Sequence, residues 1–298
     1  MQDINRNFDY RLLTKTLDLL CERYPFLRRF SIGQSVAGRE IHAVRIGRNT
    51  DNVLLAGAFH SSEHITTNVL VKFIEELCLA FENDGAVEGI NVKKGLYGRG
   101  VVIIPRVNPD GCEIAIHGKT ATAPFAEKIR NLCSGDYAHY NSNLRGVDLN
   151  HNFDADWVKL KNEEKKSGIF GPAATRYGGP FPESEPETAA LCEFCRNSDI
   201  SHVAAFHTQG EVIYWTYGDK KPPKSEQMAQ ILSSSSGYAL DEPCGIASGG
   251  GFKDWFIKEF NRPGFTVEAG VGVNPLPITD AETIYMRIRE MLMLLSIM

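Results

Sequence analysis

The chain has 298 residues, which is long enough to bury a large hydrophobic core without disulfides. Charged residues make up 23% of it and hydrophobic residues 43%, the composition of an ordinary globular protein. The net charge of −5 argues against a nucleic-acid-binding protein, and no apolar run reaches the roughly 18 residues of a membrane helix.

The N-terminal segment MQDINRNFDYRLL is charged and lacks the apolar stretch of a signal peptide, so we expect a cytoplasmic protein. Seven cysteines are scattered along the chain. Cys192 and Cys195 form a C-x-x-C pair, but they lie in an expected helix and no second pair accompanies them. We therefore interpret them as packed or surface thiols, and reduced cysteines suit the cytoplasm.

No repeat, low-complexity tract or linker interrupts the chain, so we expect one domain over residues 1–298. In chain order, the pattern predicts a helix at 9–23, two strands at 31–47, a buried strand at 52–59, a helix at 65–81, a buried strand at 98–108 with a turn at 108–111, a helix at 184–197, a strand at 201–215, a short helix at 250–260, a strand at 263–270 and a helix at 279–298. Apolar strands that alternate with helices indicate an α/β fold, in which sites gather at the carboxyl ends of the strands.

The sequence H-S-S-E-H, which begins at His60, permits two interpretations as part of a zinc site. In H-x-x-E-H both histidines bind the metal and Glu63 is the base, whereas in H-x-x-E His60 and Glu63 are both ligands. The first interpretation requires a helix from His60 to His64, because residues i and i+4 share a helix face. The strand-like run before it and the N-cap propensity of Ser61 and Ser62 favour a bend, with Glu63 in the first helical turn. We therefore favour H-x-x-E, which leaves His64 without a role.

A third ligand and a base must then come from elsewhere. His207 ends the apolar segment HVAAF; a lone strand histidine is more often a core group, but beside H-x-x-E it becomes the candidate ligand. Glu268 lies in the apolar segment PGFTVEAG, where a carboxylate is costly unless it is paired or near a metal. It could act as general base and acid beside zinc, or form a buried salt bridge with Arg106. The remaining histidines are interpreted as structural or exposed: His42, His117, His139 and His202.

Four motifs together resemble the zinc carboxypeptidase family, in the family's order and over nearly the whole chain. They are H-S-S-E at 60–63, R-G-V-D-L-N-H-N-F at 145–153, F-H-T-Q-G at 206–210 and F-T-V-E at 265–268. The resemblance implies a mixed, mostly parallel eight-stranded sheet flanked by helices. It also implies one zinc ion per chain, held by His60, Glu63 and His207, with Glu268 as general base and acid.

Further segments resemble the bacterial branch of this family that includes γ-D-glutamyl-meso-diaminopimelate peptidases. These segments are GGPFPESEPET, HTQGEVIYW, GGFKDWFI and RPGFTVEAGVGVNPLPI. Peptidases of that branch cut the cell-wall stem peptide between the γ-carboxyl of D-glutamate and diaminopimelate. The resemblance therefore implies a muropeptide or peptide substrate and a part in peptidoglycan turnover.

The chain departs from the digestive carboxypeptidases where they bind a terminal carboxylate or the reacting carbonyl. Ser62 stands where they carry an arginine, and their Asn-Arg pair becomes Asn150 and His151. Their mobile tyrosine falls on Gly245, and a cation that shorter bacterial relatives carry falls on Asn141. These departures argue against a general carboxypeptidase.

The same departures suit a substrate with additional carboxylates, because diaminopimelate carries two and γ-linked glutamate has a free α-carboxylate. We expect Asn150, His151, Arg145 and Lys253 to receive them, with Arg145 also stabilising the oxyanion. The alternatives are a conventional carboxypeptidase that acts on ordinary peptides, and an inactive relative that binds wall peptides. The presence of all four zinc-site residues argues against the inactive relative.

Overall fold

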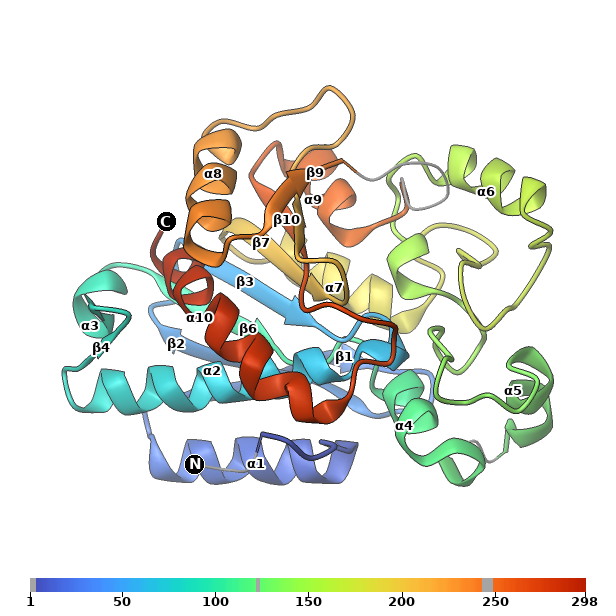
Figure 1. Cartoon of the computed structure of the whole chain (residues 1–298), viewed down its shortest axis with the longest axis horizontal. Helices are drawn as coiled ribbons and strands as arrows, with labels where there is room; N and C mark the ends of the chain where they lie inside the picture. The colour runs from blue at the N-terminus through green and yellow to red at the C-terminus, as the bar shows by residue number, and fades with distance from the viewer. Residues whose placement is uncertain (1–3, 122–123, 243–248) are drawn as a thin grey trace.

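The computed structural model describes residues 4–121, 124–242 and 249–298. Its centre is an eight-stranded sheet with the order β1-β2-β6-β3-β7-β10-β8-β9, beside a separate two-stranded ribbon (Figure 1). The strands of the large sheet are β1 (Arg28–Gln34), β2 (Glu40–Gly47), β3 (Asn52–Gly57), β6 (Gly100–Ile104), β7 (Ile200–His207), β8 (Val212–Tyr214), β9 (Ala239–Asp241) and β10 (Gly264–Glu268); the ribbon pairs β4 (Ala86–Val87) with β5 (Ile90–Asn91).

The four central strands β6, β3, β7 and β10 run parallel to one another. The pairings of β1 with β2, β2 with β6 and β8 with β10 are antiparallel, and β9 pairs in parallel with β8. The predicted α/β fold with a mixed, mostly parallel eight-stranded sheet is confirmed. The helices are α1 (Tyr10–Arg23), α2 (Ile65–Glu82), α3 (Val92–Gly95), α4 (Pro109–His117), α5 (Ala126–Leu132), α6 (Trp157–Lys166), α7 (Pro186–Arg196), α8 (Ser225–Ser236), α9 (Phe252–Phe260) and α10 (Ala281–Ile297).

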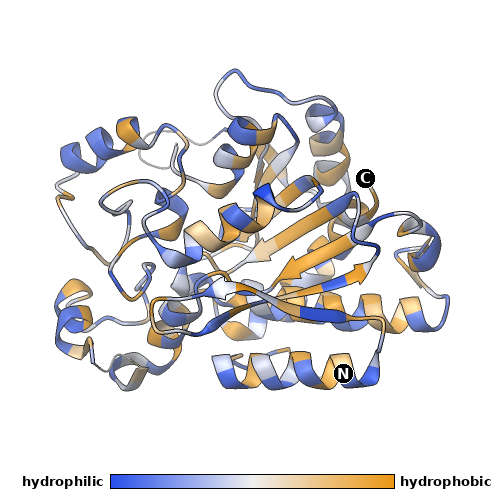
Figure 2. Ribbon diagram, turned by 180° about the vertical axis from the view of Figure 1, so that it is seen from behind, coloured by the Kyte–Doolittle hydropathy of each residue, from blue (hydrophilic) through white to orange (hydrophobic). Residues whose placement is uncertain are grey.

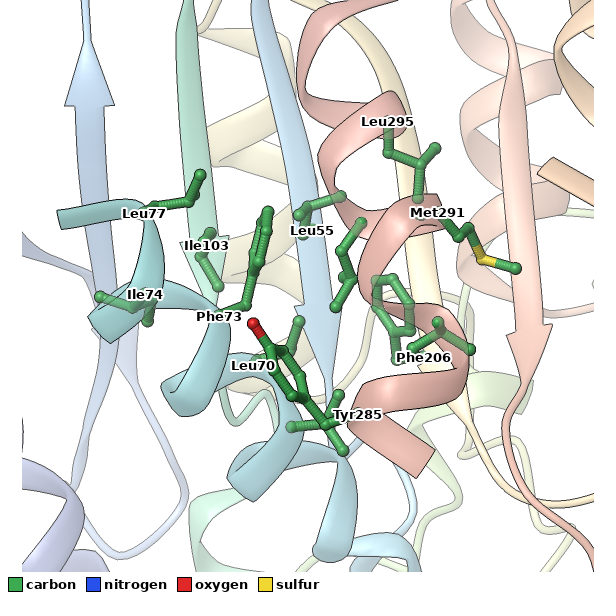
Figure 3. Close-up of a cluster of buried hydrophobic side chains, with 14 of the residues drawn as sticks. Leu55, Leu70, Phe73, Ile74, Leu77, Ile103, Phe206, Tyr285, Met291 and Leu295 are labelled. Atoms are coloured by element: carbon green, nitrogen blue, oxygen red, sulfur yellow. The ribbon is translucent and has the colours of Figure 1, made fainter. Parts of the chain in front are cut away.

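Helices bury both faces of the sheet, which explains why its central strands are largely apolar (Figure 2). Along β3, Val53 and Leu55 point into a core that includes α2, α8 and α10, and Leu54 and Ala56 point into a core that includes α7 and α9. Figure 3 shows the first core, where Leu55 lies among side chains from α2 and α10. Burial on both faces fixes the register of β3 and thus the position of its carboxyl end.

Several element boundaries differ from the expectations. The expected strand at 201–215 is two strands, β7 and β8, because the chain leaves the sheet after His207. The expected turn at 108–111 is instead the beginning of α4, where the Asn108 side chain accepts a hydrogen bond from the Gly111 N–H (2.9 Å). An asparagine cap followed by Pro109 at the first helical position is a helix-start signal that the turn interpretation overlooked.

Cys192 and Cys195 are buried and unbonded on α7, as expected for packed thiols. Burial raises the pKa of both thiols, which holds them in the unreactive protonated form. None of the helices in the described ranges combines the length and the hydrophobicity needed to cross a bilayer.

The fold also buries a neutral histidine that should make its stability depend on pH. His202 on β7 is buried, its Nε2 lies 2.8 Å from the Leu295 carbonyl oxygen, and burial lowers the pKa of His202 to about 4. The unfolded chain protonates this group below about pH 6.5, whereas the folded protein does so only near the lowered pKa. The contribution of His202 is therefore fully present above about pH 6.5 and falls by roughly 3 kcal/mol as the pH drops toward the folded pKa.

We predict that His202→Gln, which keeps a donor for Leu295 but cannot titrate, loses less thermal stability than the wild type between pH 7 and pH 4.5. His139→Gln is the control, because the side chain of His139 is 58% exposed. Thermal denaturation across this range is the measurement. Equal pH dependence in the wild type and His202→Gln would show that His202 is not the titrating group.

Candidate metal centre

Three neighbouring parallel strands bring the candidate site together at their carboxyl ends. β3 pairs with β7 and β7 pairs with β10, and these strands lie side by side in Figure 1. His207 is the last residue of β7, and Glu268, the last residue of β10, is its direct partner in the register. His60 follows three residues after the end of β3. The site thus lies where α/β sheets usually bind their ligands.

A tight bend after β3 presents His60 and Glu63 to the site. Ala58 has the left-handed φ of 52°, an uncommon conformation for a side-chain-bearing residue. The Thr66 hydroxyl holds the bend closed, since it accepts from the Ala58 N–H (2.8 Å) and donates to the Glu63 carbonyl (2.9 Å). His60 is extended and a 3-10 turn spans Ser61–Glu63. Two side chains three residues apart therefore converge across a bend instead of along an α-helix.

The details of this bend correct one expectation. Ser61 and Ser62 do not cap α2, which begins at Ile65 without a side-chain cap. Instead, the Ser61 hydroxyl donates to the Ser142 carbonyl (3.0 Å), and the Ser62 hydroxyl donates to Oδ1 of Asn141. Both serines thus attach the bend to the loop that precedes Asp148.

His60, Glu63 and His207 form a cluster whose ligand atoms all lie within 4.8 Å of one another. Nδ1 of His60 lies 2.9 Å from Glu63 Oε1, and Nδ1 of His207 lies 2.9 Å from Glu63 Oε2. The two Nδ1 atoms are 3.3 Å apart. Two imidazole nitrogens and one carboxylate are the donor set of catalytic zinc sites that leave a coordination position open.

Neighbouring side chains orient both imidazoles. His60 Nε2 lies 3.1 Å from Oδ1 of buried Asp148, so a proton shared there leaves Nδ1 free as a lone-pair donor. The ring of His207 stacks on Phe59 at a centroid distance of 5.3 Å and an interplanar angle of 19°. These contacts direct both Nδ1 atoms toward Glu63, as a metal site of this type requires.

The charges of the cluster favour a cation. Burial alone would raise the pKa of Glu63, but His60 and His207 outweigh it and lower that pKa to about 2. Burial alone would also raise the pKa of Asp148, but the nearby His60 and His151 outweigh it and lower that pKa. Burial would lower the pKa of His60, yet Glu63 and Asp148 raise it well above its usual value. Two buried carboxylates, Glu63 in the cluster and Asp148 beside it, therefore favour positive charge at this site.

Glu268 lies beside this cluster as a carboxyl group of a different character. Burial is the largest influence and, together with the charge of Glu63, raises its pKa to about 7 against the opposing effect of the histidines. The alternative salt bridge with Arg106 does not occur among the described contacts. The Arg106 guanidinium donates to the Phe8 carbonyl and lies 3.7 Å from Glu113. A partly buried carboxyl that is not held in an ion pair can exchange a proton.

His64 lies apart from the cluster. It is buried at the beginning of α2, and burial together with the charge of Arg106 lowers the pKa of its imidazole to about 4. The other histidines are also elsewhere. His42 and His202 are buried, in contrast to the surface-like setting their sequences suggest, and His117 and His139 are exposed at 40% and 58%.

The comparisons with known proteins agree with this geometry. The family model described as zinc carboxypeptidase matches residues 13–277, about nine-tenths of the chain. The chain belongs to the zinc carboxypeptidase family. It is 37% identical over 284 residues to the Gamma-D-glutamyl-L-diamino acid endopeptidase 1 of Lysinibacillus sphaericus, covering 94% of this chain and 70% of that protein. It is 30% identical over 282 residues to the uncharacterized protein YqgT of Bacillus subtilis, covering 93% of this chain and 74% of that one.

Solved structures show the same fold at lower sequence identity. Bovine thrombin-activatable fibrinolysis inhibitor superposes with a TM-score of 0.75 at 17% identity, over 98% of this chain and 97% of that chain. The murein-tripeptide amidase MpaA of Escherichia coli O157 superposes with a TM-score of 0.55 at 19% identity, over 89% and 91%. The chain is thus a metallopeptidase of the zinc carboxypeptidase family in both sequence and fold.

Ser62 and Asn141, the two positions at which the resemblance led us to look for cations, contact each other. Ser62 and Asn141 form a hydrogen bond directly beside the ligand cluster, and Ser61 N–H donates to the Asn141 carbonyl (3.2 Å). This side of the site therefore carries a neutral pair. Gly245, which stands at the tyrosine position, lies outside the described residues.

The expected substrate-binding residues differ in how available they are. Asn150 and His151 lie in the 3-10 turn after Asp148; Asn150 Oδ1 accepts from the Phe252 N–H (3.0 Å), and His151 Nδ1 lies 3.0 Å from the Arg176 carbonyl oxygen. Among the described residues, neither Asn150 Nδ2 nor His151 Nε2 takes part in an internal hydrogen bond. Both residues stay candidates for binding substrate.

The two expected cations are already paired. The Arg145 guanidinium is half exposed and lies 3.7 Å from Glu185. The Lys253 ammonium is buried and donates to the Thr216 carbonyl and to Asp254, so binding a substrate carboxylate would require it to leave both partners. The sequence did not indicate that Lys253 lies on the buried face of α9.

Sequence reasoning missed two residues of the site. Asp148 was part of a recognised motif but received no role, because its contact with His60 joins segments that are 88 positions apart. Asn274 lies in the loop after β10, and its Nδ2 donates to Glu63 Oε1 (3.3 Å). The N-P dipeptide there reads as a turn signal, and nothing in its local sequence indicates contact with a ligand.

Proposed function

We propose that this protein is a zinc metallopeptidase that hydrolyses γ-D-glutamyl–diamino-acid bonds, including those of diaminopimelate, in peptidoglycan stem peptides. The observation that carries the proposal is the arrangement of His60, Glu63 and His207 at strand ends with Glu268 adjacent to them. The substrate is supported by the 37% identity to an endopeptidase named for this bond.

We assign one zinc ion per chain to the cluster, with His60 Nδ1, His207 Nδ1 and the Glu63 carboxylate as ligands. A zinc ion bound there would polarise the scissile carbonyl and acidify a water molecule. Asp148 would keep His60 in the tautomer that exposes Nδ1, and Phe59 would hold the plane of His207.

Glu268 is the general base and then the general acid of the proposed reaction. Its carboxylate takes a proton from the attacking water and returns that proton to the departing amine. Burial that raises its pKa toward neutrality suits a group that must both accept and release a proton.

The proposed substrate offers carboxylates on both sides of the bond to be cut. Asn150 and His151 follow Asp148 directly and can donate hydrogen bonds through Nδ2 and Nε2. We also assign Arg145 to this role and to the oxyanion, since its guanidinium is half exposed and lies 3.7 Å from Glu185. Lys253 would have to break its contacts with Thr216 and Asp254 to join them.

The neutral pair of Ser62 and Asn141 distinguishes this proposal from a conventional carboxypeptidase that acts on ordinary peptides. Without cations at these positions, the site has fewer charges with which to bind an ordinary C-terminal carboxylate. The presence of Glu268, a partly buried candidate base, beside all three candidate ligands argues against an inactive peptide-binding relative. We place the reaction in the cytoplasm, where the six described cysteines, all unbonded, would stay reduced.

Glu268→Gln tests the role of the base. We predict that it retains wild-type zinc content but loses turnover by roughly 10²–10⁴-fold, because the amide keeps the shape of the side chain and cannot accept a proton. Metal analysis and steady-state kinetics are the measurements. Glu193→Gln, on the exposed side of α7, is the matched control and should retain full activity. Near-normal turnover in Glu268→Gln would remove Glu268 from the mechanism.

Mass spectrometry of products tests the substrate. We expect the zinc-loaded protein to cleave L-Ala-γ-D-Glu-meso-diaminopimelate at the γ-glutamyl bond and to leave an α-linked peptide of the same composition intact. Cleavage of the α-linked peptide alone would support the conventional carboxypeptidase. Cleavage of neither peptide by the zinc-loaded protein, despite normal zinc content, would support the inactive relative.

A further inference from the structure

We infer that Asn274 is a positioning residue that joins two of the proposed zinc ligands and sets the affinity of the site for the metal. This inference rests on the ligand assignment of the proposed function. Asn274 lies six positions after Glu268, in the loop that follows β10. The loop therefore carries a residue that reaches back into the site next to the base.

Three hydrogen bonds fix the Asn274 carboxamide. Its Nδ2 donates to the Thr208 carbonyl (2.7 Å) and to Glu63 Oε1 (3.3 Å). Its Oδ1 accepts from the Thr208 hydroxyl (2.7 Å). Thr208 directly follows His207, so the same carboxamide contacts one ligand and the neighbour of another.

The chemistry of these partners determines which way the carboxamide faces. The Thr208 carbonyl and the Glu63 carboxylate can only accept, so the amino end must point to both of them. The Thr208 hydroxyl then completes the arrangement by donating to the carbonyl end. Two acceptors, the Thr208 carbonyl and the Glu63 carboxylate, and one donor, the Thr208 hydroxyl, therefore specify the orientation of the Asn274 carboxamide.

A neutral donor is suited to this position. A hydrogen bond to Oε1 restricts rotation of the Glu63 carboxylate while leaving its negative charge for the metal. An arginine or lysine at the same place would supply a positive charge that competes with the cation. Asn274 thereby orders the ligand carboxylate without reducing its charge.

The test is the zinc dissociation constant of the full chain, measured by competition with a chromophoric chelator. Removing an outer partner of a metal ligand typically costs 10–100-fold in affinity, so we expect Asn274→Ala to raise the dissociation constant by about that factor. Thr208→Val, which loses only the donor to Oδ1, should cause a smaller increase, and Thr208→Ser should bind zinc like the wild type.

Asn52→Ala is the control for the loss of a buried carboxamide. Asn52 is buried at the opposite end of β3, where its Nδ2 donates to the Asp199 carbonyl (3.2 Å), so the variant should keep wild-type zinc affinity. The visible spectrum of the cobalt-substituted protein provides a second readout. It should change in Asn274→Ala, because the Glu63 carboxylate is less ordered, and stay unchanged in Asn52→Ala.

Zinc dissociation constants within twofold of the wild type in both Asn274→Ala and Thr208→Val would overturn the inference. If Asn274→Ala does not fold, a difference between Thr208→Val and Thr208→Ser supports the inference and equality overturns it. A wild-type protein that binds no zinc would overturn the proposed function and this inference together, whereas normal binding in every variant overturns the inference alone.

Discussion

The arrangement of the site depends on the burial of two carboxylates, Glu63 and Asp148, around the imidazole of His60. Burying a carboxylate costs free energy unless an opposite charge or hydrogen bonds compensate. Here the compensation falls on the histidines, since the pKa of His60 rises and the pKa values of both carboxyls fall. A divalent cation bound to the cluster would compensate the same charges more fully, and would leave both imidazoles neutral as ligands.

The sheet supplies the precision that such a cluster requires. Parallel pairing of β3, β7 and β10 places their carboxyl ends at one edge, and burial on both faces prevents a shift of register. The bend after β3 is irregular, with a left-handed Ala58 that the Thr66 hydroxyl stabilises. Rigid strands thus present His207 and Glu268, and a hydrogen-bonded bend presents His60 and Glu63.

The sequence predicted those parts of the fold and site that depend on local pattern. The apolar run before His60 predicted β3 and its end, and the unusual carboxylate of Glu268 in an apolar strand singled it out. Contacts between distant segments were not predictable in this way. The Ser61 and Ser62 hydroxyls bond the 141–142 loop instead of capping a helix, and Asp148 reaches His60 across the sheet edge. Lys253 was expected to bind a substrate carboxylate because of its charge, but it is buried on α9.

Anomalous X-ray diffraction at the zinc absorption edge, on crystals of the zinc-loaded protein, tests the central claim most directly. The account predicts one strong peak within bonding distance of His60 Nδ1, His207 Nδ1 and the Glu63 carboxylate, with His64 outside its coordination sphere. A peak coordinated by His60 and His64, or a zinc ion bound elsewhere while the cluster stays empty, would contradict it.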